Sequence, residues 1–259
     1  MFNHFHRGKI ALRKWLNVGS LVVETKLISK LRDFFKEFDF SGATSTRFYN
    51  TLYYEAKRGN GQKYVLNYFR LIDSPYVEDV KQKLNSKEFK LLIEDLKKLK
   101  EPKNKINKRF KLYYGSQGGG KTYKCMKDNP NAKVMVCNSS FEPGDLIESF
   151  HFKDGKPIYK PTALTLAMSL GQKIILDEIN LLSKDCLRAL QGFLDNKTEI
   201  VYKDYIIHIK EGFEIIGTMN LEINGQIESL PAPLVDRAYH IEEVVPTNEF
   251  IAELALSAE

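Results

Sequence analysis

The stretch Gly115-Ser-Gln-Gly-Gly-Gly-Lys-Thr122 decides how the rest of this chain is interpreted. It has the spacing G-x-x-x-x-G-K-S/T, in which glycines permit the tight turns that point backbone N–H groups at a phosphate. Lys121 is expected to contact the β- and γ-phosphates, and Thr122 to offer its hydroxyl to Mg²⁺. The residues expected to contact a nucleotide here are Gly115, Ser116, Gln117, Gly118, Gly119, Gly120, Lys121, Thr122 and Tyr123.

The sequence on either side of this stretch fits a phosphate-binding loop. Residues 109–114 (RFKLYY) predict a strand, and a short helix is expected to begin at Lys121, with its N-terminal N–H groups adding to the anion site. The alternative interpretation is a glycine-rich surface turn. Three further motifs downstream favour the phosphate loop.

The first of these motifs is Lys173-Ile-Ile-Leu-Asp-Glu178, an apolar run that ends in two carboxylates. A strand buried in a parallel sheet delivers the residues that follow it to the carboxyl edge of the sheet, where ligands bind. Asp177 is expected to hold Mg²⁺ through water, and Glu178 to polarise the water that attacks the γ-phosphate. A surface strand with an acidic turn is the alternative.

The second and third motifs supply an amide and an arginine. Residues 213–220 (FEIIGTMN) predict another buried strand, and Asn220 at its end is expected to orient the attacking water. Arg237 closes the segment 230–237 (LPAPLVDR), just before a last strand at 238–244. Arg237 has two interpretations: it binds a carboxylate of its own chain, or it reaches the γ-phosphate of a neighbouring subunit.

Composition limits the class of protein. The chain has 259 residues, 43% of them hydrophobic and 28% charged, which is typical of a globular protein with one large or two small domains. No apolar run reaches the roughly 18–20 residues of a membrane span, so no membrane partner is expected. The cysteines are widely spaced and odd in number, which favours a reducing compartment, and we expect the cytoplasm. They are Cys125, Cys137 and Cys186.

The charge is uneven. Residues 1–110 hold 24 Lys and Arg against 12 Asp and Glu, while the remainder carries a net charge of −6. Helical spacing over 10–15, 24–38, 46–57, 64–72 and 86–99 predicts a basic, mostly helical N-terminal domain at 1–101, with 102–108 as a linker. Aromatic and cationic residues are interleaved there, which indicates either base stacking on nucleic acid or a helical core with a lysine-rich surface. The aromatic members are Tyr49, Tyr53, Tyr54, Tyr64, Tyr68 and Phe69.

Between the nucleotide motifs the chain predicts further elements. Residues 133–137 (KVMVC) indicate a short buried strand, and 162–170 and 187–194 indicate helices. Two hairpins are expected, one over 145–159 around Asp154-Gly155 and one over 198–210.

Taken together, residues 109–245 resemble AAA+ ATPases, in particular the MoxR / McrB-like (dynein-related, helix-2-insert) branch. Gly115–Thr122 resembles Walker A, residues 173–180 Walker B, 215–220 sensor 1, and 230–237 the arginine-finger segment. The two hairpins resemble the helix-2 insert and the insert before sensor 1. Four ordered motifs and two inserts are far more specific than a lone phosphate loop.

The resemblance implies an α/β fold with a parallel five-stranded sheet of order 5-1-4-3-2, flanked by helices, over residues 109–259. It also implies ATP and Mg²⁺ bound between subunits of a ring, usually a hexamer, which remodels a protein or, less often, a nucleic acid. Only about 14 residues follow Val245, so the C-terminal lid of the family is expected to be short or absent. Asn220 is followed by LEING rather than the McrB-type residues, which favours ATP over GTP.

Three functions remain open from the sequence. The first is an oligomeric ATPase that remodels a protein or protein–nucleic-acid partner, in which Lys121, Glu178, Asn220 and Arg237 are catalytic and Thr122 and Asp177 hold the metal. The second is a DNA-directed motor or loader that grips DNA or RNA through the basic N-terminal region. The third is a nucleotide-switched assembly factor that binds ATP with little turnover.

Overall fold

A computed structural model describes residues 25–38, 45–99, 107–221, 229–248 and 250–251 of the chain. The chain divides into two compact units, one of residues 1–66 and 75–106 and the other of residues 67–74 and 107–259. The expected helix over 10–15 lies outside the described residues. No helix in the described ranges is both long and apolar enough to cross a membrane.

The first unit is helical. Its elements are α2 (Thr25–Phe35), which continues as the 3₁₀ helix η1 (Lys36–Phe38), α3 (Thr46–Lys57), the first part of α4 (Gly61–Leu71), α5 (Val77–Leu84) and α6 (Lys87–Lys98). The serines that precede α3 and α6 cap them: Ser45 Oγ accepts a hydrogen bond from Phe48 N at 3.3 Å, and Ser86 Oγ accepts one from Phe89 N at 3.2 Å. The expected helices of this region are confirmed where the structure describes them, and α5 was not predicted.

Aromatic side chains form the core of this unit. The rings of Phe35, Phe48 and Tyr64 are buried, and Phe48 packs against the other two at centroid distances of 5.9 and 5.6 Å. Tyr49 and Tyr53 are also buried, which favours the helical-core interpretation for these rings. Rings inside a core cannot stack on bases, so the helical-core interpretation, and not base stacking, describes these residues.

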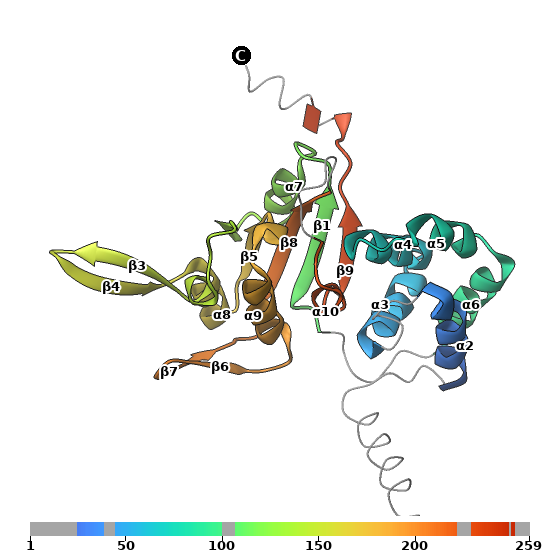
Figure 1. The fold of residues 1–259 in the computed structure, drawn as a ribbon, viewed down its shortest axis with the longest axis horizontal. Helices are drawn as coiled ribbons and strands as arrows, with labels where there is room; N and C mark the ends of the chain where they lie inside the picture. The colour runs from blue at the N-terminus through green and yellow to red at the C-terminus, as the bar shows by residue number, and fades with distance from the viewer. Residues whose placement is uncertain (1–24, 39–44, 100–106, 222–228, 249, 252–259) are drawn as a thin grey trace, which may run out of the picture. The chain divides into compact units, whose positions relative to one another are not determined.

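The second unit is built on a five-stranded parallel sheet (Figure 1). Its strands are β1 (Phe110–Gly115), β2 (Lys133–Val136), β5 (Lys173–Asp177), β8 (Glu214–Asn220) and β9 (His240–Glu243). Their order is β2-β5-β8-β1-β9, and every neighbouring pair is parallel. Numbered along the chain, these five strands have the expected order 5-1-4-3-2, and the expected α/β fold is confirmed.

The sheet places the loops that carry the predicted site residues at one edge. In a parallel sheet all carboxyl ends lie on the same side, so the loops after β1, β5 and β8 meet there. The register confirms this, because Gly115 at the end of β1 is opposite Asn220 at the end of β8. The helices of this unit are α7 (Lys121–Asp128), α8 (Ala163–Leu170), α9 (Lys184–Leu194) and α10 (Ala232–Val235), with 3₁₀ turns η3 (Pro143–Leu146) and η4 (Ile179–Leu181).

One strand differs from its expected burial. The run over 133–137 reads as a buried strand, but Val134 is 37% exposed and Val136 is 61% exposed. The reason is the position of β2 at the edge of the sheet, where it pairs only with β5. Apolar side chains on an edge strand are therefore not evidence of burial on both faces.

Residues 67–74, the end of α4 and the turn after it, belong to the second unit rather than to the expected N-terminal domain. The hydroxyl of Tyr114 in β1 donates a hydrogen bond to Asn67 Oδ1 at 2.5 Å, and Tyr68 donates one to Asp236 Oδ1 at 2.7 Å. Tyr114 and Asn67 are both buried, so the pair belongs to the core of this unit.

Both expected hairpins are present as separate two-stranded sheets, and Figure 1 shows each extending away from the central sheet. The first is β3 (Glu148–Lys153) and β4 (Lys156–Pro161), with the turn at Asp154-Gly155, and the second is β6 (Glu199–Tyr202) and β7 (Tyr205–His208). The two hairpins touch through Glu148, which accepts a hydrogen bond from the Tyr202 hydroxyl at 3.2 Å and pairs with Lys203.

Candidate nucleotide-binding site

The loop between β1 and α7 has the backbone geometry that its glycines predict. Gly118 and Gly120 have φ values of 71° and 75°, in the left-handed region that side chains disfavour. Gly120 is the N-cap of α7, so the N–H groups of the first turn of that helix face the loop. A Cβ on Gly119 would lie 2.9 Å from the carbonyl oxygen of Ser116, which only a glycine avoids.

Lys121 is folded back onto this loop. Its Nζ donates hydrogen bonds to the carbonyl oxygens of Ser116 at 2.7 Å and Gly115 at 3.3 Å, and the residue is only 6% exposed. Burial lowers the pKa of the Lys121 ammonium, while the nearby carboxylates Asp177 and Glu178 act to raise it. A phosphate group that enters the loop would satisfy this partly desolvated cation.

Three oxygens meet beside the loop. Thr122 Oγ1 donates a hydrogen bond to Asp177 Oδ1 at 2.6 Å, and the Thr218 hydroxyl donates to the same carboxylate oxygen at 2.5 Å. Hydroxyl and carboxylate oxygens are the ligands that Mg²⁺ prefers, usually with several waters retained. Thr122 and Asp177 therefore fit the metal role that the sequence predicts for them.

Glu178 is held in an unusual backbone conformation, with φ 57° and ψ 46°. This left-handed geometry costs about 1 kcal/mol or more for a residue other than glycine, and such strain gathers at functional sites. Its backbone N–H donates to the Thr218 hydroxyl at 3.1 Å, and its carboxylate Oε1 accepts a hydrogen bond from Asn220 Nδ2 at 2.9 Å. The side chain of Glu178 is thus fixed next to the amide that was predicted to orient water.

One cavity of about 350 Å³ brings these groups together. Its walls come from the loop, from the ends of β5 and β8, and from the segment after β9. The lining residues are Gln117, Gly118, Gly119, Gly120, Lys121, Thr122, Tyr123, Asp177, Glu178, Thr218, Asn220 and Phe250. Of the residues predicted for the nucleotide, Gly115 and Ser116 are outside this lining and instead bind the Lys121 ammonium.

Arg237 lies elsewhere. It follows α10 and precedes β9, and the neighbouring Tyr239 N–H donates to the carbonyl of Phe110 at the start of β1, at the sheet edge opposite the loop. Its Nε donates a hydrogen bond to Asp195 Oδ1 at 3.1 Å, and its Nη2 lies 3.1 Å from the same oxygen. Within this chain Arg237 therefore binds a carboxylate, which is the first of its two interpretations, and its action on a neighbouring subunit stays a prediction.

Two residues that line this site, Thr218 and Phe250, were not predicted from the sequence. Thr218 lies two positions before Asn220 on β8, and side chains two apart on a strand lie on the same face. The alternation of side chains along the strand could therefore have predicted that Thr218 lies on the same side as Asn220. A threonine inside an apolar strand otherwise indicates only β-propensity. Phe250 follows β9 at a distance, and nothing in the local sequence connects it to the loop.

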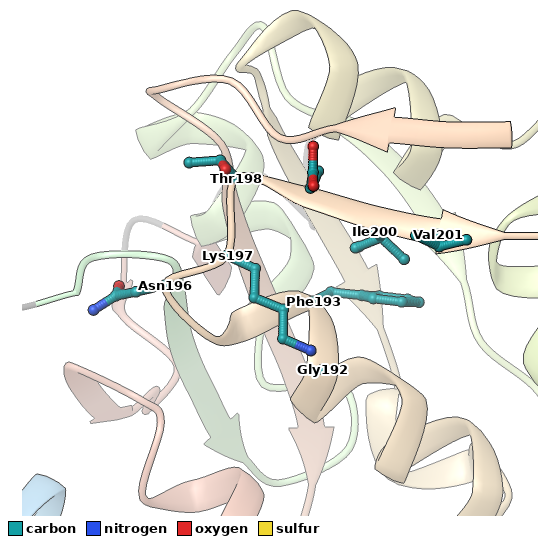
Figure 2. A pocket seen from close by; sticks show the side chains of 8 residues that line it. Gly192, Phe193, Asn196, Lys197, Thr198, Ile200 and Val201 are labelled. Atoms are coloured by element: carbon teal, nitrogen blue, oxygen red, sulfur yellow. The ribbon is translucent and has the colours of Figure 1, made fainter. Parts of the chain in front are cut away.

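A second and larger cavity, of about 600 Å³, lies between the end of α9 and the start of β6 (Figure 2). Figure 2 shows the Phe193 ring and Ile200 among its walls. Only Lys197 and Glu199 among its lining residues are ionisable, and it lacks the converging hydroxyl, carboxylate and amide groups of the phosphate cavity. Size alone does not make it the better candidate for chemistry.

Parts of this chain are similar to known proteins. Residues 112–238 match the model of the AAA domain (dynein-related subfamily). Midasin of Giardia intestinalis is 34% identical over 83 residues, which are 31% of this chain and 2% of that protein. The solved structure of a suspected ATPase from Cytophaga hutchinsonii is 18% identical, with a TM-score of 0.47 over 59% of this chain and 46% of that one.

The segment 112–238 therefore belongs to the AAA+ ATPases, in the dynein-related, MoxR-like branch. The chain spans only a small part of the length of Midasin, so the activity and partners of that whole protein are not transferred to it. The family assignment rests on the match over residues 112–238, and the sheet order agrees with it.

Proposed function

We propose that this protein binds ATP with Mg²⁺ and hydrolyses it to ADP and phosphate. One observation carries the proposal: the Glu178 carboxylate is bonded to Asn220 at 2.9 Å, in the same cavity as Lys121, Thr122 and Asp177. A water activator, a phosphate-binding cation and two metal-ligand oxygens are the parts that phosphoryl transfer to water requires.

Each residue of the site has a role that follows from its chemistry. The N–H groups of the loop and the Lys121 ammonium hold the β- and γ-phosphates and stabilise the charge that develops on them. Thr122 and Asp177 hold Mg²⁺, which when bound neutralises phosphate charge. The hydrolytic proton leaves the attacking water for the Glu178 carboxylate, and Asn220 keeps that carboxylate and the water in line.

We further propose that the active form is a ring of identical subunits, with a hexamer as the expected size. Support comes from the position of Arg237, because it lies outside the cavity of its own chain and the family places such an arginine at the neighbouring subunit's γ-phosphate. The bond from Arg237 to Asp195 has to open for this role. Mixing an Arg237→Ala variant with a Glu178→Gln variant tests the shared site. The first variant supplies Glu178 and the second supplies Arg237, so hydrolysis returns in the mixture only if one site is built from two subunits.

The partner we propose is a protein client. Rings that would have stacked on bases are buried in the first unit, whereas the β3–β4 hairpin exposes Phe150, Phe152 and Tyr159. Exposed apolar side chains gathered on one element are typical of protein interaction surfaces. The remaining support for nucleic acid is the positive charge of residues 1–110, a weaker argument because lysines also serve as ordinary surface residues.

Phosphate release from ATP and Mg²⁺ by the full chain tests the reaction, with Glu178→Gln as the blank. We expect turnover in the wild type and none above background in the variant. Hydrolysis in the variant at a rate near the wild type would remove Glu178 from the mechanism. Binding of ATP without hydrolysis by the wild type would favour the nucleotide-switched assembly factor.

A further inference from the structure

An ion pair joins the ends of two helices in the second unit. Arg237 follows α10, and Asp195 follows α9. The Nε and Nη2 atoms of Arg237 each lie 3.1 Å from the same carboxylate oxygen of Asp195, Oδ1. The third nitrogen, Nη1, donates a hydrogen bond to the Pro233 carbonyl at 2.5 Å. Pro233 belongs to the same short segment as Arg237, so of these two contacts it is the ion pair that ties the guanidinium to another element.

The burial of the pair allows it both to hold Arg237 and to open. The Arg237 side chain is 15% exposed, and that of Asp195 is 30% exposed. A hydrogen-bonded ion pair that is partly withdrawn from water is stronger than one on the open surface, where such pairs contribute little. Both side chains still reach the solvent, so the pair can separate without unfolding α9 or α10.

The backbone at Asp195 is held by groups other than Arg237. Asn107 Nδ2 donates a hydrogen bond to the Leu194 carbonyl at 2.7 Å, and Arg109 Nη1 donates one to the Asp195 carbonyl. Both donors come from the segment that leads into β1, so the turn after α9 keeps its place when Arg237 leaves. Burial lowers the pKa of Arg109, while the Asp195 carboxylate acts to raise it. Arg109 therefore remains as a second positive charge near this carboxylate after Arg237 has departed.

We propose that the Arg237–Asp195 ion pair is an autoinhibitory contact, which withholds Arg237 from the neighbouring subunit until a nucleotide bound there competes for it. This inference rests on the proposed function, which places Arg237 in a site shared by two subunits. The γ-phosphate of the neighbour offers the guanidinium the same kind of charged hydrogen bond as the Asp195 carboxylate, with more negative charge. Asp195 lies outside the lining of the phosphate cavity of its own chain, so it is a positioning residue that acts through Arg237.

The ion pair then sets the fraction of subunits whose Arg237 is available to a neighbour. When only a fraction of a protein is in the competent state, its apparent affinity is reduced by that fraction. A partly buried ion pair of this kind is expected to shift the balance about fivefold toward the closed pair. The wild type should therefore require about fivefold more protein for half-maximal hydrolysis than a chain that lacks the Asp195 carboxylate.

Steady-state phosphate release over a range of protein concentrations tests this expectation. Asp195→Ala should reach half-maximal activity at about fivefold lower protein concentration than the wild type. Its ATP binding, measured by calorimetry in the Glu178→Gln background, should not change, which also shows that the variant is folded. The matched control is Asp185→Ala, because Asp185 is also on α9 but is 74% exposed and pairs with Arg188 at 3.4 Å. This control should leave the concentration dependence unchanged.

A double-mutant cycle tests the pair by a readout other than hydrolysis. The nucleotide-free wild type, Asp195→Ala, Arg237→Ala and the double variant are unfolded in urea. The two substitutions should be coupled by about fivefold in the unfolding equilibrium constant, the same factor as in the rate measurement. Additive effects of the two substitutions would overturn the autoinhibitory contact, because Asp195 would then not hold Arg237.

The rate measurement can overturn the inference in two further ways. Asp195→Ala that binds ATP normally but gains no activity at low protein concentration would exclude autoinhibition. Activation by Asp195→Ala that persists when Arg237 is also replaced would show that Asp195 acts on another group. In both cases the proposed function stands if the wild type hydrolyses ATP and Arg237→Ala does not. If Arg237→Ala hydrolyses ATP as fast as the wild type, the shared site fails, and this inference fails with it.

Discussion

Replacing Thr218 with valine tests whether the ends of β5 and β8 act as one unit. The Thr218 hydroxyl is fully buried, donates to Asp177 at 2.5 Å and accepts from the Glu178 N–H at 3.1 Å. Valine removes both bonds and leaves the Glu178 N–H without this acceptor. An orphaned buried donor costs about 1–3 kcal/mol, so we expect the free energy of unfolding to fall by that amount.

The effect on activity should exceed what a loss of stability explains. Thr218 holds the Asp177 carboxylate, which is proposed to bind Mg²⁺, and the backbone of Glu178. Removing a hydrogen-bond partner of a metal ligand typically lowers metal affinity or activity about 10- to 100-fold. We therefore expect kcat to fall 10- to 100-fold in Thr218→Val, with ATP binding in the absence of Mg²⁺ unchanged.

The assay is steady-state phosphate release over a range of Mg²⁺ concentrations, at a temperature where the variants are folded by circular dichroism. Thr218→Ser is the control, because it keeps the hydroxyl and loses one methyl, at a cost of about 1 kcal/mol in stability. It should retain most of the wild-type kcat. A Thr218→Val enzyme with kcat within twofold of the wild type and reduced stability would refute the positioning role and leave Thr218 as a core residue.

Three other predictions follow from the geometry. Lys121→Ala should weaken ATP binding about 10- to 100-fold by calorimetry, because a charged hydrogen bond to phosphate is lost. Gly171→Ala should lower the unfolding temperature, because Gly171 has φ 71° and a Cβ there would collide with a carbonyl of the loop before β8. The control is Gly192→Ala in helix α9, which has open space around it and should not lower the unfolding temperature. Burial raises the pKa of the Cys125 and Cys137 thiols to about 12, so both should resist thiol reagents until unfolding. Their ionisation in the unfolded chain should lower stability by about 1–2 kcal/mol each at pH 10 relative to pH 7, measured by urea titration.

Much of the second unit follows from sequence because its motifs are local. Each polar cluster directly follows an apolar strand, and parallel strands deliver such clusters to one edge. That reasoning predicts the meeting of Lys121, Thr122, Asp177, Glu178 and Asn220, and the cavity is lined by all five. The strand order, by contrast, came from the family resemblance and not from the strands themselves.

What escaped prediction depends on long-range contacts. Phe250 reaches Gly120 only through the path of the chain after β9, and no periodicity encodes that path. Tyr68 looks like a candidate for base stacking in the sequence, but its hydroxyl binds Asp236 and its ring is buried. The interleaving of aromatic and basic residues is a local property of the sequence. Whether a given ring is buried depends on contacts with residues far away in the sequence, which the local pattern does not contain.

The most direct test of the central claim is the identity of the nucleotide that each form retains. Wild type and Glu178→Gln are incubated with ATP and Mg²⁺, passed rapidly over a desalting column, and the bound nucleotide is quantified. We expect intact ATP on the variant and ADP on the wild type, because the proposed role of Glu178 and Asn220, which are hydrogen-bonded to each other, is to activate the water, whereas that of the loop and Asp177 is to bind the nucleotide and its metal. ADP on Glu178→Gln, formed as fast as on the wild type, would contradict the assignment of Glu178 as the base.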